Sequence, residues 1–244
     1  MTVSAVIFDW GGTLTPFHRI DLYDLWRAAA EVLAPDHVDE VARALTDAEA
    51  AWWGRAVASG RSGTTADVFA AASAAVGLDV GRFLDDPALH DQALLAHLDA
   101  WTPHTFTDPQ AAPLLAALRE RGLRTGLLSN THWPREWHER WLARDGILDL
   151  LDGRVYTSDL QHLKPHAEAF RAALTAVSPA GGLLLDPAEV VFVGDRPLDD
   201  ISGAAAVGMR TILIANSDVP GHPVEPDASI TELGDVLGLV DGWR

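Results

Sequence analysis

Residues 3–14 read VSAVIFDWGGTL, an apolar run that stops at Asp9 and is followed by Gly11 and Gly12. A continuous run of branched and aromatic residues is typical of a strand that is buried on both faces of a parallel sheet. A carboxylate followed by glycines, which leave the backbone uncovered, is typical of a place where the chain approaches a ligand. The run therefore predicts a central strand with a functional group at its carboxyl end.

Further short apolar runs alternate with helical patterns along the rest of the chain. The runs cover residues 124–128, 154–157, 190–193 and 211–214, and the helical patterns cover residues 111–121, 134–143, 167–177 and 198–207. This alternation predicts an α/β fold, a Rossmann-like parallel sheet with helices on both faces. Ser129 directly follows one of the runs, and Asp195 follows another after Gly194, so we expect both to meet Asp9 at the ligand-binding edge of the sheet.

Residues 17–101 break this alternation. The segment is rich in alanine and leucine and contains no strand-like run, but four helical patterns cover about residues 21–34, 38–58, 65–77 and 87–100. We therefore expect a small all-helical domain at residues 17–101. The core domain then comprises residues 1–16 and 102–244, joined to the helices near residues 15–20 and 101–107.

Composition limits the classes of function. The chain has 244 residues, a formal net charge of −17 and no cysteine. The missing cysteines exclude disulfides, thiol nucleophiles and thiolate metal sites. The negative charge argues against a nucleic-acid partner, because it would repel a phosphate backbone. The N-terminus does not resemble a signal peptide, and no apolar run reaches about 18 residues, so we expect a cytoplasmic protein that has no membrane partner.

Four segments together resemble a known set of motifs. In chain order they are FDWGGTL at residues 8–14, LLSN at residues 127–130, LKPHAEAF at residues 163–170 and VFVGDRPLDDISGAAAVGM at residues 191–209. Their order and spacing resemble the four motifs of the haloacid dehalogenase superfamily. The resemblance implies a hydrolase with a haloacid dehalogenase-like core. It also implies a helical cap, inserted after the first strand, that closes over the active site.

The resemblance assigns the groups that handle a phosphate. It makes Asp9 the nucleophile, which forms an aspartyl-phosphate and so divides one difficult displacement into two easier ones. Ser129 would donate its hydroxyl and Asn130 its backbone N–H to the phosphate, while Gly11 and Gly12 leave the backbone open to it. Lys164, the one lysine in the chain, would neutralise the phosphoryl oxygens as a compact charge. The implied substrate is a small phosphorylated metabolite.

The resemblance also implies a Mg²⁺ cofactor, a cation that prefers oxygen ligands and keeps several waters. Asp9, Asp195 and the backbone carbonyl of Gly11 would hold it. Asp200 would orient metal-bound water or Lys164. The neighbouring Asp199 either shares this role or serves as an acid at the N-terminus of a helix.

Gly11 departs from the pattern of the phosphatases in this superfamily. These enzymes usually carry a second Asp two residues after the nucleophile, where it protonates the leaving group and then activates water. Such help is typically worth about 100- to 10,000-fold in rate. Glycine has no side chain to transfer a proton, so the substrate needs either a good leaving group or another proton carrier. His18 and His132, which closely follow two of the motifs, are candidates, although each can also be an ordinary surface histidine.

Three other functions remain open on the sequence. A phosphonoacetaldehyde hydrolase also carries a small residue at the position of Gly11, but it needs a lysine in the insert, and residues 1–163 contain none. A 2-haloacid dehalogenase would use Asp9 without a metal, although the acidic fourth motif argues for a cation. A catalytically weak module that binds a phosphorylated ligand is favoured by the glycine and opposed by the retention of Lys164.

The tryptophans divide into two groups. Trp133, Trp137 and Trp141 recur every four residues on one helical face, which indicates packing or, alternatively, a homodimer contact; the chain is expected to be a monomer or a homodimer. Trp26, Trp52, Trp53 and Phe69 are expected to form the core of the helical bundle, with a place at the pocket as the alternative. Trp10, beside the nucleophile, either lines the substrate entrance or packs under the cap.

Overall fold

The computed structural model describes residues 2–76 and 86–244. Within these residues, six parallel strands form one sheet in the order β3-β2-β1-β4-β5-β6. They are β1 (Ala5–Phe8), β2 (Arg124–Ser129), β3 (Gly153–Tyr156), β4 (Val190–Gly194), β5 (Arg210–Ile214) and β6 (Ala228–Ile230). Because β1 pairs with β2 on one side and β4 on the other, the residues that follow these three strands meet at one edge.

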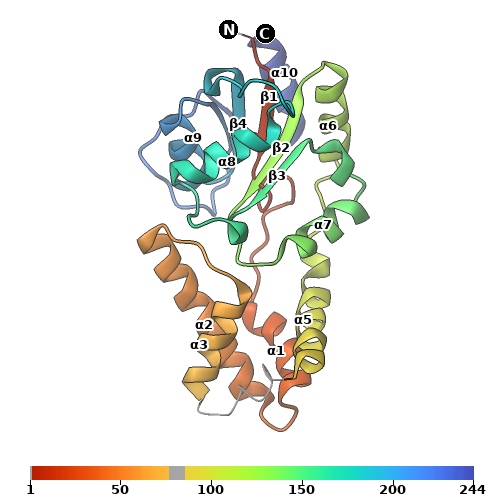
Figure 1. Ribbon diagram of the computed structural model, residues 1–244, viewed down its shortest axis with the longest axis vertical. Coiled ribbons are helices and arrows are strands. Elements are labelled where there is room, and N and C mark those ends of the chain that lie inside the picture. Colours follow the sequence, from red (N-terminus) through yellow and green to blue (C-terminus); the bar gives the residue numbers. More distant parts are fainter. Residues whose placement is uncertain (1, 77–85) are drawn as a thin grey trace.

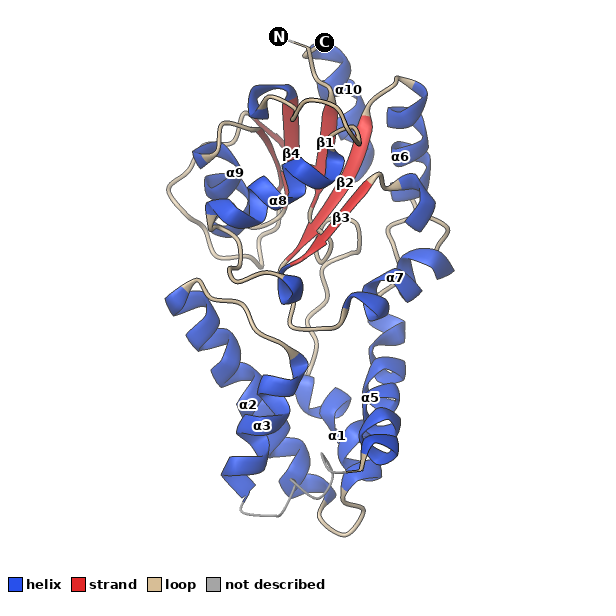
Figure 2. Cartoon of the chain, viewed as in Figure 1, coloured by secondary structure: helices blue, strands red, loops and turns tan. Residues whose placement is uncertain are grey.

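Helices cover both faces of the sheet, as Figures 1 and 2 show. Alternate residues of β1 point to opposite layers. Val6 and Phe8 belong to the same buried cluster as residues of α6 (Ala111–Glu120) and α10 (Val236–Gly242). Ala5 and Ile7 pack with residues of α8 (Ala167–Val177) and α9 (Gly203–Ala206). The three-layer α/β architecture expected from the alternating pattern is confirmed.

A group of helices lies beyond the carboxyl edge of the sheet, at the bottom of Figure 1. It comprises α1 (Leu22–Leu33), α2 (Val38–Ser59), α3 (Thr65–Val76) and α5 (Pro87–Trp101). Trp26 and Phe69 are at most 1% exposed in its core, and Trp52 is 6% exposed, so these three side chains pack as expected. The predicted helix at 65–77 is observed to Val76, and residue 77 lies outside the described part.

The chain leaves the sheet after β1 and returns before α6 through two neighbouring segments. The N–H of Asp108 donates to the carbonyl of Leu14 at 2.8 Å and closes the base of the insert. On the other side of the site, the N–H of Leu163 donates to the carbonyl of Gly60 at 3.1 Å. The helical group therefore contacts the loop that carries Lys164, besides being covalently connected to the sheet.

Several elements differ from the sequence prediction. The first strand begins at Ala5 rather than Val3, and the short strand β6 and helix α10 carried no clear pattern. Residues 197–202 form a π-helical turn before α9 instead of the continuous helix expected from residue 198. α7 (Arg135–Arg144) begins one residue after Pro134. None of the described helices is long and apolar enough to span a membrane.

Candidate active site

The carboxyl edge of the sheet brings the predicted site residues together. Asp9 follows β1, Ser129 ends β2 and Asp195 follows β4, and their exposed fractions are 5%, 3% and 1%. Lys164, in the loop before α8, is 3% exposed, and Asp200, in the π-helical turn, is fully buried. The sequence expectation that these side chains share one edge agrees with this geometry.

Lys164 lies between two carboxylates. Its ammonium nitrogen is 2.6 Å from Oδ1 of Asp9 and 2.6 Å from Oδ1 of Asp200. Burial disfavours the charged ammonium, but the charges and hydrogen bonds of Asp200 and Asp9 outweigh that effect, so the pKa of Lys164 is raised. The lysine is therefore a fixed positive charge beside the proposed nucleophile.

Asn130 holds the backbone of Lys164 in place. Its Oδ1 accepts from the N–H of Lys164 at 2.8 Å, and its Nδ2 donates to the carbonyl of Lys164 at 3.1 Å. This reciprocal pair joins the end of β2 to the lysine loop. The side chain of Asn130 thus has a positioning role that the sequence did not indicate, beside the phosphate contact expected of its backbone N–H.

Asp9, Asp195 and Asp200 form a cluster of three carboxylates whose ligating oxygens lie within 4.8 Å of one another. Among the described residues, neither oxygen of Asp195 has a hydrogen-bond partner, although both are buried. Burial, reinforced by the charges of Asp9 and Asp200, raises the pKa of Asp195 to about 7. An unpaired buried carboxylate is costly unless a cation compensates it. This oxygen-rich cluster therefore fits Mg²⁺.

Two glycines are required by close approaches at the cluster. Gly12 has φ +86°, and a Cβ there would lie 2.4 Å from Oδ2 of Asp195. A Cβ at Gly194 would lie 2.4 Å from the Cγ of Asp200. Gly11 is different, because a Cβ there would meet nothing within 4 Å. The position of the missing second Asp is therefore open space.

A cavity of about 480 Å³ adjoins the carboxylate cluster, and Asp9 is the member of the cluster that lines it. Asp9, Ser129 and Lys164 line it from the sheet edge. Glu49, Trp53 and Val57 line it from α2, where their spacing of four residues places them on one face of the helix. Trp53 is half-buried at this wall, so of the four aromatic residues expected in the bundle core, it is the one placed at the pocket.

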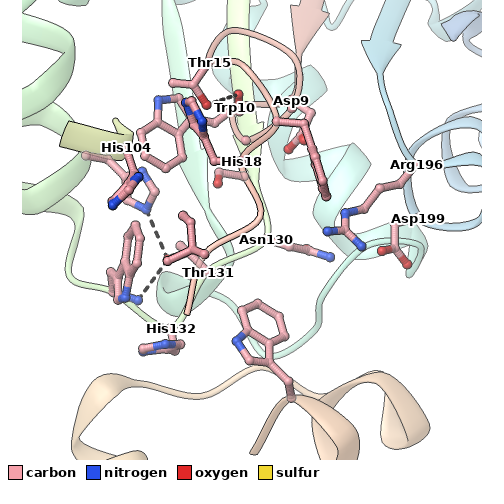
Figure 3. A pocket seen from close by; sticks show the side chains of 18 of the residues that line it. Asp9, Trp10, Thr15, His18, His104, Asn130, Thr131, His132, Arg196 and Asp199 are labelled. Atoms are coloured by element: carbon pink, nitrogen blue, oxygen red, sulfur yellow. Dashed lines mark hydrogen bonds between the residues drawn. The ribbon is translucent and has the colours of Figure 1, made fainter. Parts of the chain in front are cut away.

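Arg196 and Asp199 stand together on one side of this cavity, and His104 stands on the other (Figure 3). Burial raises the pKa of Asp199, while Lys164 and Arg196 oppose that shift. Asp200 is held more firmly, because its Oδ2 accepts from the N–H of Arg196 at 2.9 Å. Burial, opposed by Lys164, raises the pKa of Asp200 to about 6.

The histidines at the cavity differ in how they are held. His132 contacts Oε1 of Glu49 through Nε2 at 3.0 Å and Oγ1 of Thr65 through Nδ1 at 3.1 Å, so both ring nitrogens are engaged. His18 lies instead against His104, with their ring centroids 5.9 Å apart, and both line the cavity. The geometry thus favours His18 over His132 as a proton carrier. It adds His104, which no sequence motif had marked.

Trp10 is 7% exposed and contacts both the buried core and the cavity. It stacks on Trp141, with the ring centroids 5.6 Å apart and an interplanar angle of 9°, and it also lines the cavity. Trp133, Trp137 and Trp141 are each at most 8% exposed in the same buried cluster. They pack against the core, as one of the two interpretations expected.

Comparisons with known proteins agree with this geometry. Residues 3–208 match the haloacid dehalogenase-like hydrolase family. A glyceraldehyde 3-phosphate phosphatase of Pyrococcus abyssi is 35% identical over 105 residues, which are 43% of this chain and 40% of that protein. A phosphoglycolate phosphatase of Rhodospirillum rubrum is 29% identical, over 96% of this chain and 91% of that protein. The chain spans about half the length of the curated glyceraldehyde 3-phosphate phosphatases it matches.

Solved structures share the fold over the whole chain. A 2-haloacid dehalogenase from Pseudomonas syringae pv. Tomato DC3000 superposes with a TM-score of 0.70 at 20% identity, covering 100% of both chains. At this identity the likeness concerns the fold alone. The match to the family, which covers the first three motif segments and the fourth as far as residue 208, decides the classification: the chain belongs to the haloacid dehalogenase-like hydrolases.

Proposed function

We propose that this hydrolase is a magnesium-dependent phosphatase of a small phosphorylated metabolite and works through an aspartyl-phosphate on Asp9. The observation that carries the proposal is the buried cluster of Asp9, Asp195 and Asp200, two members of which, Asp9 and Asp200, hold the ammonium of Lys164. The phosphatase names of several relatives support the same reaction type.

Asp9, Asp195 and the carbonyl of Gly11 would hold Mg²⁺. When bound, the cation supplies positive charge to the phosphoryl oxygens. Lys164 supplies a second positive charge next to Asp9, since its ammonium contacts Oδ1 of that side chain. Asp200 keeps the ammonium in place through a second contact of 2.6 Å.

In the first step, a carboxylate oxygen of Asp9 attacks phosphorus, and the bond from phosphorus to the leaving oxygen breaks with its electron pair. The hydroxyl of Ser129 and the N–H of Asn130 donate to the phosphoryl oxygens, where preorganised donors are worth most in a buried site. In the second step, water attacks the phosphorus of the aspartyl-phosphate, which releases phosphate and restores Asp9.

Gly11 leaves the proton of the leaving group to another donor or to solvent. His18 and His104 line the cavity without the paired contacts that occupy both nitrogens of His132. We assign proton transfer to this pair where the leaving group needs it. The open space at Gly11 also suggests a direct test, because Gly11→Asp restores a carboxyl without a clash at the Cβ.

The division of the chain belongs to the same proposal. Residues 1–16 and 102–244 form the catalytic core, and residues 17–101 form a cap that covers the site and supplies the helical wall of the cavity. The active unit is a monomer or a homodimer.

The deciding experiment measures phosphate release from acyl phosphates, sugar 1-phosphates and terminal sugar phosphates, with and without Mg²⁺. Asp9→Asn is the loss-of-function control, and we expect it to lower the rate by roughly a thousandfold or more, as loss of a nucleophile does elsewhere. Gly11→Asp should increase the rate most for the poorest leaving groups. Release that survives in Asp9→Asn would contradict the proposed nucleophile.

The other functions predict different results in the same assay. Halide release from 2-haloacids without added metal, together with no phosphate release, would identify a dehalogenase that uses Asp9. Binding of phosphorylated ligands without turnover of either kind would identify a binding module. The unpaired oxygens of Asp195 favour the phosphatase, because the dehalogenase reaction needs no cation.

A further inference from the structure

The cavity above the carboxylate cluster has two chemically different ends. The sheet edge contributes Asp9, Lys164 and Arg196, whereas the helical side contributes Trp53 and Val57 from α2. Val57 is 63% exposed at the rim of this cavity, and Trp53 is half-buried in its wall. The phosphoryl group belongs at the charged end, so the leaving group faces the apolar end.

Flat aromatic surfaces make up much of the remaining wall. Four tryptophans line the cavity: Trp53 and Trp101 from α2 and α5, and Trp10 and Trp133 from the loops that follow β1 and β2. The Trp101 and Trp133 rings contact each other at 4.7 Å and 69°, and the Trp10 and Trp133 rings at 6.1 Å and 77°. These edge-to-face contacts hold the indoles in fixed orientations. They present ring faces and edges of the kind that prefer another aromatic ring.

The charged side chain at the helical end, Glu49, already has hydrogen-bond partners within the protein. Among the described residues that line the cavity, the lysine and arginine side chains are Lys164 and Arg196, both from the sheet edge. Glu49, the carboxylate on the helical side, has Oε1 on His132 and Oε2 on Trp26. A leaving group with its own carboxylate would find no lysine or arginine at that end, and a cationic one would find no unpaired acid.

The missing proton donor at Gly11 favours a leaving group that departs without being protonated. An aromatic hydroxyl has a pKa of about 10, several units below that of an alkyl alcohol. Its oxyanion departs with little protonation. When the P–O bond breaks, both electrons stay on the aryl oxygen, which then takes a proton from water. An aromatic alcohol therefore satisfies both the cavity wall and the chemistry of Gly11.

We propose that the substrate is a phosphomonoester of an uncharged aromatic alcohol, whose ring lies between the indoles of the cavity while its phosphate meets Asp9. This inference rests on the proposed phosphatase function. A cavity of about 480 Å³ falls within the range of roughly 300–1,000 Å³ that is typical of small-molecule sites, so it accommodates one or two fused rings.

Four probes separate ring recognition from leaving-group chemistry in the full-length chain with Mg²⁺. 2-Naphthyl phosphate combines an aromatic ring with a good leaving group, and 2-naphthylmethyl phosphate keeps the ring but leaves as an alkyl alcohol. Cyclohexyl phosphate lacks the aromatic ring, and acetyl phosphate is small with a good leaving group. We expect kcat/KM for 2-naphthyl phosphate to exceed that for cyclohexyl phosphate at least tenfold. The naphthylmethyl ester should have a similar KM and a lower kcat.

Variants at the cavity wall test the recognition directly. Trp53→Ala should lower kcat/KM about tenfold for 2-naphthyl phosphate, several-fold more than for acetyl phosphate, and Trp53→Phe should recover most of the loss. Trp243→Ala, which removes a half-buried tryptophan outside the cavity, is the matched control and should leave both rates unchanged.

The outcomes distinguish this inference from the proposed function. Asp9-dependent release from acetyl phosphate with no preference for the naphthyl ester over the cyclohexyl ester would overturn the inference and leave the phosphatase standing. An equal loss on all probes in Trp53→Ala would also overturn it. Release of phosphate from none of the four probes would overturn both.

Discussion

The ammonium nitrogen of Lys164 lies 2.6 Å from Oδ1 of Asp200, and the side chains are 1% and 0% exposed. The same nitrogen contacts Asp9, and the carboxylate of Asp195 completes the cluster. One ammonium therefore contacts two of the three carboxylates in the cluster. Because each uncompensated buried charge is costly, Lys164 is a stabilising element of the site as well as part of its chemistry.

Replacing this lysine should destabilise the protein in a way that a cation partly reverses. We expect Lys164→Met to lower the free energy of unfolding by about 3 kcal/mol without Mg²⁺, since the carboxylates then repel one another. Addition of Mg²⁺ should recover part of that loss in urea unfolding, but not the phosphatase activity. Arg171→Met, an exposed cation on α8, is the control. Equal stability of both variants would contradict the role given to Lys164.

Asp195 should be required for Mg²⁺ to stabilise the folded protein. Magnesium at about 100 times its dissociation constant should stabilise the wild-type protein by about 2.7 kcal/mol, visible as a higher Tm. Asp195→Asn should remove most of that shift and lose no stability without the metal, because it takes away one of three crowded carboxylates. Asp149→Asn, on an exposed acid, should keep the full shift. A full shift in Asp195→Asn would place the cation elsewhere.

The two glycines after the nucleophile should respond in opposite ways to alanine. Gly12→Ala forces a Cβ toward Asp195 in a left-handed backbone conformation, so we expect a loss of about 1–2 kcal/mol or more and almost no activity. Gly11→Ala has open space at its Cβ and should unfold near the wild-type midpoint. Chemical unfolding of both variants, measured in parallel, compares their stabilities. Similar midpoints for the two would show that the backbone adapts at Gly12.

Glu49 should anchor the helical group to the sheet. Its oxygens lie 2.5 Å from Nε1 of Trp26 and 3.0 Å from Nε2 of His132. Glu49→Ala leaves Nε1 of Trp26 and Nε2 of His132 buried without a partner, which we expect to cost about 3 kcal/mol in unfolding experiments. Glu49→Gln retains hydrogen bonding and should lose less. Glu40→Ala, on the exposed side of α2, should be nearly neutral; a comparable loss there would remove the special role of Glu49.

His97 should make the protein sensitive to acid. Burial lowers its pKa from 6.5 to about 4, although the hydrogen bond with the carbonyl of Leu25 and the charge of Glu49 partly oppose the shift. The N–H of Trp101 donates to Nε2 at 3.0 Å, so that nitrogen must stay unprotonated. Between pH 6.5 and 4, the imidazole of His97 is protonated in the unfolded chain but not in the folded chain. The contribution of His97 is therefore intact above pH 6.5, and it falls by about 1.4 kcal/mol per pH unit between pH 6.5 and 4.

Unfolding in urea at several pH values measures this dependence. Between pH 6.5 and 4, His97→Gln should reduce the slope of the free energy of unfolding against pH by about 1.4 kcal/mol per pH unit, the value for one proton. His222→Gln, on an exposed histidine, should leave that slope unchanged. An unchanged slope in His97→Gln would mean that the imidazole accepts its proton in the folded state.

The sequence anticipated the parts of the fold that rest on local pattern. The apolar runs at β1 and β4 are buried on both faces, so they stood out without any knowledge of their neighbours. β6 has only three residues, too few for a periodicity, and its partner β5 decides its conformation. The sequence predicts ordinary helix over residues 198–207. The first turn of that helix departs from the α-helical pattern at the buried Asp200, a tertiary constraint that propensity does not contain.

The same distinction holds for the site. Asp9, Ser129 and Asp195 were found because strand ends converge by topology. His104 and Glu49 were missed because they enter the cavity only through the packing of helices far apart in sequence. The spacing of Glu49, Trp53 and Val57 was a usable signal. It marked one face of α2 but did not reveal which element that face would meet.

The hydrogen bond from Asp108 to the carbonyl of Leu14 gives the insert neighbouring entry and exit points. Because a loop costs only about 0.6 kcal/mol more for each doubling of its length, the inserted segment can grow, shrink or be replaced with little penalty. The register of β1 against β2 does not change when it does. Duplication and divergence can therefore exchange the wall that selects the ligand while the carboxylates at the strand ends remain in place.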